Sequence, residues 1–372
     1  MLKILFIFGT RPEAIKLCPL IRCLRESSGR FEVRVAVTAQ HREMLDQVLE
    51  AFQVRPDYDL DLMLPGQTLF QSTSRILAGL EPVLAAERPH MALVQGDTNT
   101  TFCGALASFY KQIPVGHVEA GLRTGDIRQP FPEEMNRVLT AKLATLHFAA
   151  TENAAENLRR EGVDPLRITV TGNTGIDALL FIRGGLETGR LPAGAWPELD
   201  SRRKIILVTA HRRESFGTGF ERICEALAEL SRRDDVRIVY PVHPNPNVRE
   251  PVRKHLAGNP NVLLLEPQGY VPFVDLMRRA YLLITDSGGI QEEGPSLGKP
   301  ILVLRDKTER PEAVSAGTVK LVGTDPQTIV REATRLLDDA AEYDRMSRVH
   351  NPYGMGDSSG RIADVIESFL RE

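Results

Sequence analysis

The chain has 372 residues, of which 42% are hydrophobic and 26% are charged, and its formal net charge is −3. This length favours two domains, because a domain typically holds about 100–200 residues. The composition gives no sign of a basic nucleic-acid-binding surface, and no apolar run reaches the ~18 residues of a membrane-spanning helix. We therefore expect a cytoplasmic globular protein without a nucleic-acid or membrane partner.

Short apolar runs alternate with helical patterns along the whole chain, which is typical of an α/β protein whose parallel sheets are buried on both faces. The first strand is predicted at 3–8 and the first helix at 12–26, with Pro12 near a helix start. The other strands of the first half are predicted at 33–38, 91–95, 114–118 and 146–149. Together they predict one doubly wound unit.

A second unit is predicted after a stretch at 182–203, where glycines and prolines crowd a segment with little periodicity that we interpret as a linker. Its strands are predicted at 204–209, 236–242, 262–265, 282–285, 301–304 and 319–322. The last helix is predicted to return to the first half, so the expected domains are 1–172 with 355–372, and 173–354. Two such domains predict a central crevice where the carboxyl ends of both sheets face each other.

The four cysteines, Cys18, Cys23, Cys103 and Cys224, form no CxxC pair and have apolar neighbours in predicted helices. We expect them to be reduced and mostly buried, and we predict no metal site.

Two glycine-containing turns are candidates for binding a phosphate group. The turn after the first strand carries Arg11 and Lys16, which suit diphosphate oxygens but could also be a surface pair. The stretch LLITDSGGIQEEGPSLGKPILVLRDKTER, which begins at Leu282, predicts strand, glycine turn, helix and strand. Its glycines let a ligand approach the backbone and its helix start attracts an anion, yet a tight turn with a serine N-cap fits equally well.

Acidic side chains occur at strand ends and at a helix start in the first half. Asp97 directly follows a strand, and capping of the next helix is the competing interpretation. Glu119 directly follows the next predicted strand and lies two residues before Gly121, a position where solubility alone rarely requires a carboxylate. Glu133 and Glu134 open a helix, which the helix dipole favours for structural reasons alone.

Polar and aromatic side chains also follow strands of the second half. His211 has two arginines beside it, so a phosphate contact competes with an ordinary structural role. His243 lies in a proline-rich turn that fits loop architecture or ligand contact equally well. Gln268 and Phe273 supply an amide and a ring, a pair that can hydrogen-bond and stack on a base.

Seven motifs occur in order along nearly the whole chain: FGTRPEAIK, QGDTNTT, HVEAGLRTGD, FPEEMNR, TAHRRESFG, TDSGGIQEEGPSLGKP and RDKTERPEA. In combination they resemble the bacterial non-hydrolysing UDP-N-acetylglucosamine (UDP-GlcNAc) 2-epimerases. The resemblance implies two Rossmann-like domains in a glycosyltransferase type B fold, a homodimer, and no cofactor or metal. It also implies interconversion of UDP-GlcNAc and UDP-ManNAc through anti elimination of UDP, a 2-acetamidoglucal intermediate and re-addition.

The resemblance further implies roles for individual residues. The residues implied in catalysis are the acids Asp97, Glu119 and Glu133 and the histidine His211, which would lie near the diphosphate. The residues implied in phosphate binding are Arg11, Lys16, Ser287, Gly288, Gly289 and Arg310. Gln268, Phe273 and Glu293 are implied in uridine and ribose binding.

Some related enzymes use UDP-GlcNAc as an allosteric activator as well as a substrate. The matching positions here are Gln40, Gln67, Glu133 and His243. Gly66 and Glu43 stand where regulated relatives can carry Arg and Gln, so the resemblance leaves activation open.

Three alternatives to this function remain. A hydrolysing 2-epimerase would release UDP and free ManNAc, and its sequences resemble this chain less closely. A glycosyltransferase of the same fold would need an acceptor groove, and a non-catalytic UDP-sugar-binding protein would need no acids at three strand or helix ends.

Overall fold

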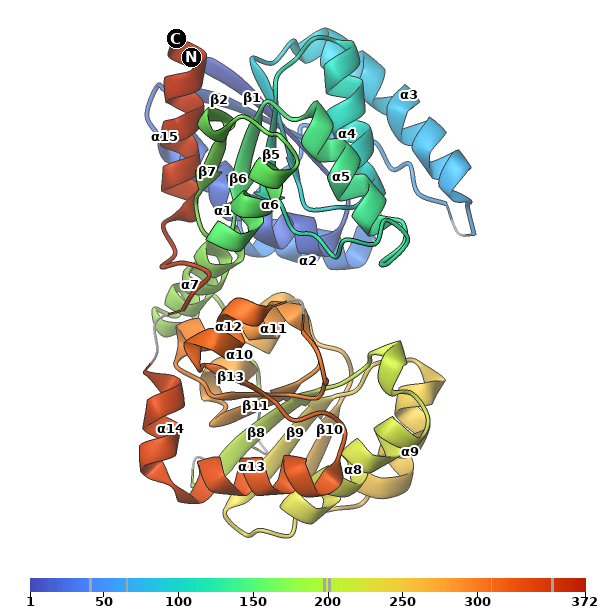
Figure 1. Ribbon diagram of the computed structural model, residues 1–372, viewed down its shortest axis with the longest axis vertical. Helices are drawn as coiled ribbons and strands as arrows, with labels where there is room; N and C mark the ends of the chain where they lie inside the picture. The colour runs from blue at the N-terminus through green and yellow to red at the C-terminus, as the bar shows by residue number, and fades with distance from the viewer. Residues whose placement is uncertain (40–41, 65, 197–198, 200–201, 309, 349–350) are drawn as a thin grey trace. The chain divides into compact units, whose positions relative to one another are not determined.

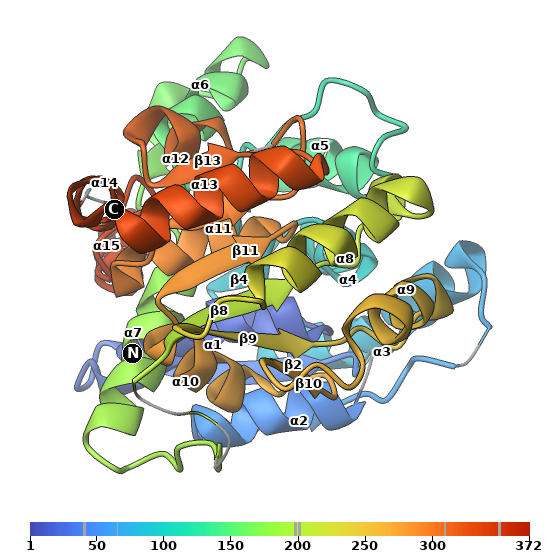
Figure 2. The same ribbon diagram turned by 90° about the horizontal axis from the view of Figure 1, so that it is seen from below.

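The computed structural model describes the chain from 1 to 372 except residues 40–41, 65, 197–198, 200–201, 309 and 349–350. It divides into two compact units, 1–181 with 353–372 and 182–352 (Figures 1 and 2). Each unit is a parallel sheet with helices packed against it, and the fold-class prediction of two doubly wound α/β units is confirmed.

The first unit contains a seven-stranded parallel sheet in the order β3-β2-β1-β4-β5-β6-β7. Its strands are β1 (Leu2–Phe8), β2 (Phe31–Val37), β3 (Tyr58–Asp59), β4 (Met91–Gln95), β5 (Val115–Ala120), β6 (Leu146–Ala149) and β7 (Ile168–Val170). Its helices are α1 (Arg11–Glu26), α2 (Arg42–Ala51), α3 (Leu69–Glu87), α4 (Asn99–Tyr110), α5 (Glu133–Leu143), α6 (Glu152–Arg160), most of α7 (Thr174–Glu187) and α15 (Ser358–Arg371). The strand order reverses between β1 and β4, and ligands of doubly wound sheets bind at the carboxyl ends beside such a reversal.

The second unit contains a six-stranded parallel sheet in the order β10-β9-β8-β11-β12-β13, which reverses between β8 and β11. Its strands are β8 (Lys204–Thr209), β9 (Val236–Pro241), β10 (Val262–Leu265), β11 (Leu282–Thr285), β12 (Ile301–Val303) and β13 (Val319–Leu321). Its helices are α8 (Thr218–Leu230), α9 (Pro246–Leu256), α10 (Tyr270–Arg279), α11 (Gly288–Glu293), α12 (Pro311–Ala316), α13 (Pro326–Asp338) and α14 (Ala340–Ser347). Helices α8 and α13 lie side by side on this sheet, and their apolar faces join its core (Figures 1 and 2).

All predicted strands are present, and two edge strands that were not predicted, β3 and β7, hold two and three residues. The interpretation of 182–203 as a linker is wrong for its first residues, since α7 continues to Glu187. The ring of Phe181 in α7 stacks on Phe52, 5.0 Å away. This packing places the boundary after Phe181, whereas the expected domain ended at residue 172.

The chain returns to the first unit at Tyr353, two residues before the expected position. The backbone N–H of Asn173 donates to the Tyr353 carbonyl at 2.8 Å, and the Ser359 N–H donates to the Asp177 carboxylate at 2.8 Å. These bonds fix the start of α15, which packs on α1 as predicted (Figure 1).

The four cysteines are free and lie in α1, α4 and α8; three are buried and Cys23 is half-buried, as predicted. In the described part of the chain, no helix is long and apolar enough to cross a membrane. The same residues contain no group of three or more His, Cys, Asp or Glu side chains placed to hold a metal ion.

Candidate functional site

Several of the predicted residues follow the strands at which the strand order of each sheet reverses. In the first unit, Arg11 and Lys16 follow β1, and Asp97 follows the neighbouring strand β4. In the second unit, His211 follows β8 and Ser287 follows the neighbouring strand β11. Each sheet therefore presents predicted site residues where doubly wound sheets bind ligands.

Glu119 is held at the end of β5 through both oxygens of its carboxylate. Lys16 forms an ion pair with Oε1, and Gln95 donates from Nε2 to Oε2. Its side chain is only 8% exposed, and its φ of 62° lies in the left-handed region. A non-glycine residue in that conformation is strained, and such strain concentrates at functional sites. A Cβ at Gly121 would lie 2.1 Å from the Ala154 carbonyl oxygen, so this turn also requires a glycine.

Asp97 is held by two residues of α5, and it does not cap the following helix. Arg137 pairs with its carboxylate, and Asn136 Nδ2 donates to its carbonyl oxygen at 2.9 Å. His117 Nε2 donates to the preceding carbonyl, that of Gly96, at 2.7 Å. The cap of α4 is Thr98, whose hydroxyl accepts from the N–H of Thr101 at 3.1 Å. The capping interpretation of Asp97 is therefore wrong.

The two acids that open α5 have different environments. Glu134 is buried, accepts from the Thr124 and Gly125 N–H groups at 3.0 and 3.2 Å, and pairs with Arg137 at 3.2 Å. Glu133 lies half-buried at the first position of the helix. Glu134 thus has structural partners, which leaves Glu133 as the better candidate for contact with a ligand.

Arg11, the other predicted phosphate contact of this unit, is half-buried at the start of α1. Its guanidinium approaches the Met44 sulfur at 3.8 Å. Lys16, predicted as a second phosphate contact, forms an ion pair with Glu119.

In the second unit, Asp286 organises the turn that carries His211. Its buried carboxylate accepts from the N–H groups of His211 and Arg212 at 2.6 and 2.7 Å and lies 3.4 Å from His211 Nδ1. The His211 ring stacks on His243 at 5.2 Å with an interplanar angle of 11°. Partial burial and the neighbouring His211 lower the pKa of His243. His211 remains 41% exposed, so a ligand can reach it.

The glycine turn after β11 is built as predicted, with Ser287 at the N-cap of α11 and Gly288 and Gly289 in its first turn. A Cβ at Gly288 would lie 3.4 Å from the guanidinium carbon of Arg310. Arg310 Nε donates to Glu292 Oε1 at 2.6 Å, which fixes the cation beside the turn. The structure therefore brings Arg310 to the predicted phosphate cradle.

The residues predicted for uridine and ribose lie near the cradle in sequence or on α10. Gln268 donates to the Glu266 carbonyl at 2.7 Å, and Phe273 is half-buried in α10. Glu293 accepts from the Tyr270 hydroxyl at 3.1 Å, which orients its carboxylate.

Of the residues predicted for allosteric binding, Gln40 lies outside the described residues. Gln67 lines a pocket of about 630 Å³ at the start of α3 together with Leu64, Gly66 and Phe70, and its Nε2 lies 3.0 Å from the Met63 sulfur.

Several residues that hold the candidate site residues in place were not predicted to do so, namely Gln95, Arg137, Asp286 and Glu292. All of these residues lie within the motifs quoted from the sequence, but a motif does not predict which side chain each of its residues will contact. The position of Asp286 directly after a buried strand was the one available signal.

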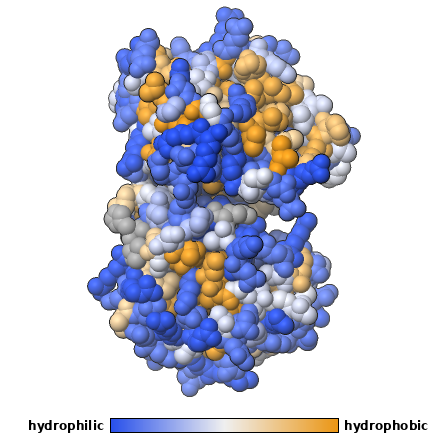
Figure 3. Space-filling view, viewed as in Figure 1, coloured by the Kyte–Doolittle hydropathy of each residue, from blue (hydrophilic) through white to orange (hydrophobic). Residues whose placement is uncertain are grey.

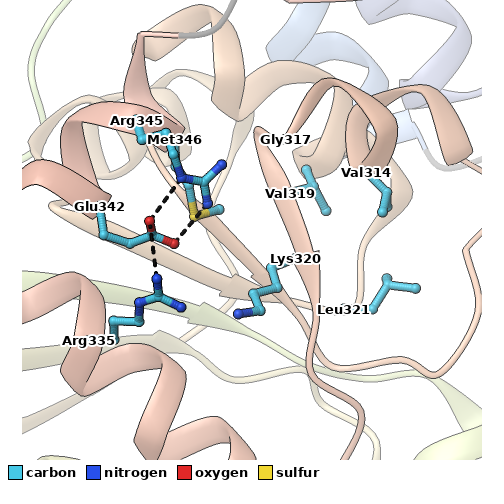
Figure 4. Close-up of a pocket in the computed structure, with 9 residues that line it drawn as sticks. All are labelled: Val314, Gly317, Val319, Lys320, Leu321, Arg335, Glu342, Arg345 and Met346. Atoms are coloured by element: carbon cyan, nitrogen blue, oxygen red, sulfur yellow. Dashed lines mark hydrogen bonds and ion pairs between the residues drawn. The ribbon is translucent and has the colours of Figure 1, made fainter.

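One further pocket, of about 620 Å³, lies beside the edge strand β13 and contains none of the predicted residues (Figure 4). Glu342 at its wall pairs with Arg345 at 2.8 Å and with Arg335 at 3.5 Å (Figure 4). Glu342 offsets only part of the positive charge of this lining, which carries Lys320, Arg335 and Arg345.

Comparison with known proteins identifies the family of the chain. A family model described as UDP-N-acetylglucosamine 2-epimerase matches residues 24–367. The chain is 59% identical to the UDP-N-acetylglucosamine 2-epimerase of Escherichia coli O157:H7 over 99% of both chains. It is 49% identical to that of Campylobacter jejuni over 98% of this chain and 97% of the relative.

The solved structures that resemble the chain include UDP-GlcNAc 2-epimerases as well. The UDP-GlcNAc 2-epimerase from Neisseria meningitidis, bound to UDP-GlcNAc, is 48% identical over 100% of both chains, with a TM-score of 0.90. That of Methanocaldococcus jannaschii, in complex with UDP-GlcNAc and UDP, is 34% identical over 99% of this chain and 100% of the other, with a TM-score of 0.79. A glycosyltransferase of kitacinnamycin, 16% identical over 98% of both chains with a TM-score of 0.64, shares the glycosyltransferase type B fold alone. The chain therefore belongs to the UDP-N-acetylglucosamine 2-epimerase family.

Proposed function

We propose that the chain catalyses the reversible epimerisation of UDP-GlcNAc to UDP-ManNAc at C2 of the sugar, without hydrolysis. Family membership supports the substrate. The observation that carries the proposal is the division of the site residues, with acids at the reversal of the first sheet and a phosphate cradle at that of the second.

In this proposal, UDP leaves before or while C2 loses its proton. C2 carries no activating carbonyl, so its proton becomes acidic only when the C1–O bond breaks and positive character develops at C1. The bonding electrons leave with the β-phosphate oxygen of UDP, a carboxylate takes the C2 proton, and a C1=C2 double bond forms. UDP then adds back at C1 while a proton returns to the opposite face of C2.

The acids of the first unit supply the two proton-transfer groups that inversion at C2 requires. Lys16 and Gln95 orient Glu119, and Arg137 orients Asp97, whose side chain remains 29% exposed. We propose that Asp97, Glu119 and Glu133 share proton transfer and stabilisation of the cleavage step.

The second unit holds UDP and stabilises its departure. Ser287, Gly288, Gly289 and Arg310 bind the diphosphate together with Arg11 and Lys16 of the first unit, and His211 stabilises the leaving group or gives it a proton. Gln268, Phe273 and Glu293 bind the uridine and ribose. Charge that is preorganised around a leaving diphosphate is worth most in the transition state.

The test is turnover of UDP-GlcNAc alone by the purified protein, followed by proton NMR. The proposal predicts an equilibrium mixture of two UDP-sugars. Accumulation of free ManNAc and UDP would instead favour a hydrolysing epimerase, and turnover that requires an added acceptor would favour a glycosyltransferase.

We also propose a homodimer in the cytoplasm that supplies ManNAc units for a surface polysaccharide. Exposed apolar side chains support an oligomer: Leu69 and Phe70 begin α3, and Phe109 and Tyr110 end the adjacent helix α4. Figure 3 shows apolar surface gathered on this unit. Light scattering should give twice the chain mass of 41.3 kDa, and a monomer at working concentration would contradict the dimer.

Allosteric activation by a second UDP-GlcNAc remains a prediction for Gln40, Gln67, Glu133 and His243. A sigmoidal dependence of the rate on UDP-GlcNAc that becomes hyperbolic in Gln67→Ala would support it. A hyperbolic wild-type curve would count against it.

A further inference from the structure

Glu13 is a buried carboxyl group that the proposed reaction does not use. It lies in the first turn of α1, is 1% exposed, and accepts hydrogen bonds through both oxygens. Oε2 accepts from the N–H groups of Gly9 and Thr10 at 3.1 and 2.7 Å. Oε1 accepts from the hydroxyl of Thr98 at 2.8 Å and lies 3.1 Å from that of Thr101.

Only half of this arrangement is ordinary helix capping. The capping box of α1 accounts for Oε2, because Thr10 accepts from the Glu13 N–H while Glu13 accepts from the Thr10 N–H. Oε1 lies outside the box and reaches the start of α4, which follows a different strand. Glu13 therefore ties the turn after β1 to the turn after β4.

These two turns carry the residues on which the proposed reaction depends. The first leads to Lys16, one helical turn after Glu13, and the second contains Asp97. The Thr101 hydroxyl also donates to the Gln95 carbonyl at 2.6 Å, and the Gln95 side chain donates to Glu119. A continuous chain of contacts thus joins Glu13 to Glu119.

The two turns also pack against each other without free space. A Cβ at Gly9 would lie 2.0 Å from the Thr38 hydroxyl and 2.8 Å from the Thr100 hydroxyl. These two hydroxyls are hydrogen-bonded to each other at 2.9 Å. A shift of either turn would therefore have to displace buried polar groups.

We propose that Glu13 is a positioning residue, which fixes Lys16 and Asp97 relative to each other by bridging the turns after β1 and β4. This role rests on the proposed epimerase function. Burial raises the pKa of Glu13, and the hydrogen bonds to Thr10, Thr98 and Gly9 oppose that rise. The bridge needs hydrogen-bonding geometry and not a negative charge.

Two substitutions separate the hydrogen-bonding geometry of Glu13 from its negative charge. In Glu13→Gln, the carbonyl oxygen can accept from the two N–H groups, and the amide can donate to the two hydroxyls, which are free to rotate. In Glu13→Ala the whole bridge is lost. Asp177→Ala is a matched control, because Asp177 is also a buried carboxyl in this unit, with a pKa raised by burial, and it ties α7 to α15.

The experiment compares wild type and these variants well below their melting temperatures. Glu13→Ala should lower kcat and C2 deuterium exchange by roughly 10- to 100-fold, since small misplacement of reacting groups has effects of that size. Its affinity for UDP should fall much less than kcat, because only Lys16 among the proposed phosphate contacts is displaced while Ser287, Gly288, Gly289 and Arg310 of the second unit are intact. Glu13→Gln should keep kcat near that of the wild type, and Asp177→Ala should lose thermal stability while keeping kcat.

Amide hydrogen exchange supplies a readout that does not depend on activity. Exchange at 9–10 and 98–101 should be faster in Glu13→Ala and close to wild type in Glu13→Gln. Unchanged exchange in Glu13→Ala, or a kcat equal to that of Asp177→Ala, would overturn the positioning role. If the wild type is inactive, the proposed function is wrong, and so is the proposed effect of Glu13 on kcat. The amide exchange data would still show whether Glu13 bridges the turns after β1 and β4.

Discussion

Lys16 and Glu119 form an ion pair at the end of the first sheet, although 103 positions separate them in the sequence. Gln95 donates to the other oxygen of the same carboxylate. A phosphate group bound to Lys16 would therefore compete with or share the contact of Lys16 with Glu119. The pair links the residue predicted to hold diphosphate to a residue predicted to move a proton.

Lys16→Met tests this link. We expect kcat to fall roughly 100-fold, because general acid–base catalysis by a well-placed group contributes at least that factor and Glu119 would lose its cationic partner. Lys111→Met, which removes an exposed pair with Glu81, should leave kcat unchanged. If Lys16→Met raises only KM, Lys16 is a phosphate contact alone.

Gly288→Ala tests the phosphate cradle. The new methyl group would meet the Arg310 guanidinium at ordinary contact distance, so the fold should tolerate it. It would also occupy space beside the backbone that the diphosphate approaches, and UDP affinity should fall. Gly360→Ala in α15 meets open space and should stabilise the helix by up to about 1 kcal/mol without affecting UDP. Equal UDP affinities in calorimetry for both variants would exclude this turn as the cradle.

Glu293→Gln tests the ribose contact. A hydrogen bond to a charged group is worth about 1.5–3 kcal/mol, so UDP affinity should fall by roughly tenfold or more. Binding of 2′,3′-dideoxy-UDP should change far less, since the contact is then already absent. Equal losses for both nucleotides would mean that Glu293 acts on another part of the ligand.

Buried histidines make stability depend on pH. Burial, with a smaller effect of Arg123, lowers the pKa of His147 to about 4, and burial lowers that of His117 to about 3. Unfolding restores values near 6.5, so the unfolded chain binds more protons below that pH, and stability is lost as the pH falls. His147 alone should reduce the free energy of unfolding by about 2 kcal/mol between pH 7.5 and 5.

Urea unfolding at both pH values checks this prediction. His147→Leu removes the titrating group, and its loss of stability on acidification should be smaller than that of the wild type by about this amount. An equal loss in both proteins would show that His147 titrates normally in the folded state.

The sequence predicted the strands well because buried parallel strands are continuous apolar runs with polar strand ends. That signal made Asp97, Glu119 and His211 candidates, and the family resemblance implied their roles. The order of the strands within a sheet leaves no comparable local pattern. The adjacency of β1 and β4, and with it the reversal that locates the site, appears only in the folded chain.

The partners of individual side chains could not be predicted either, because contacts between residues far apart in the sequence leave no local pattern. Arg137 pairs with Asp97 across 40 positions, and Asp286 holds a turn 75 positions earlier in the chain. The continuation of α7 through Gly184 and Gly185 was missed because glycine disfavours helices locally, whereas packing of Phe181 on Phe52 supplies tertiary support for this helix.

Proton transfer at C2 by the carboxylates of the first unit is tested most directly by proton NMR of UDP-GlcNAc in D2O. The wild type should place deuterium at C2 of both UDP-sugars. Asp97→Asn should bind UDP with unchanged affinity and lose most of this exchange. Unchanged exchange in Asp97→Asn would remove Asp97 from the mechanism, and wild-type turnover without deuterium at C2 would contradict the account itself.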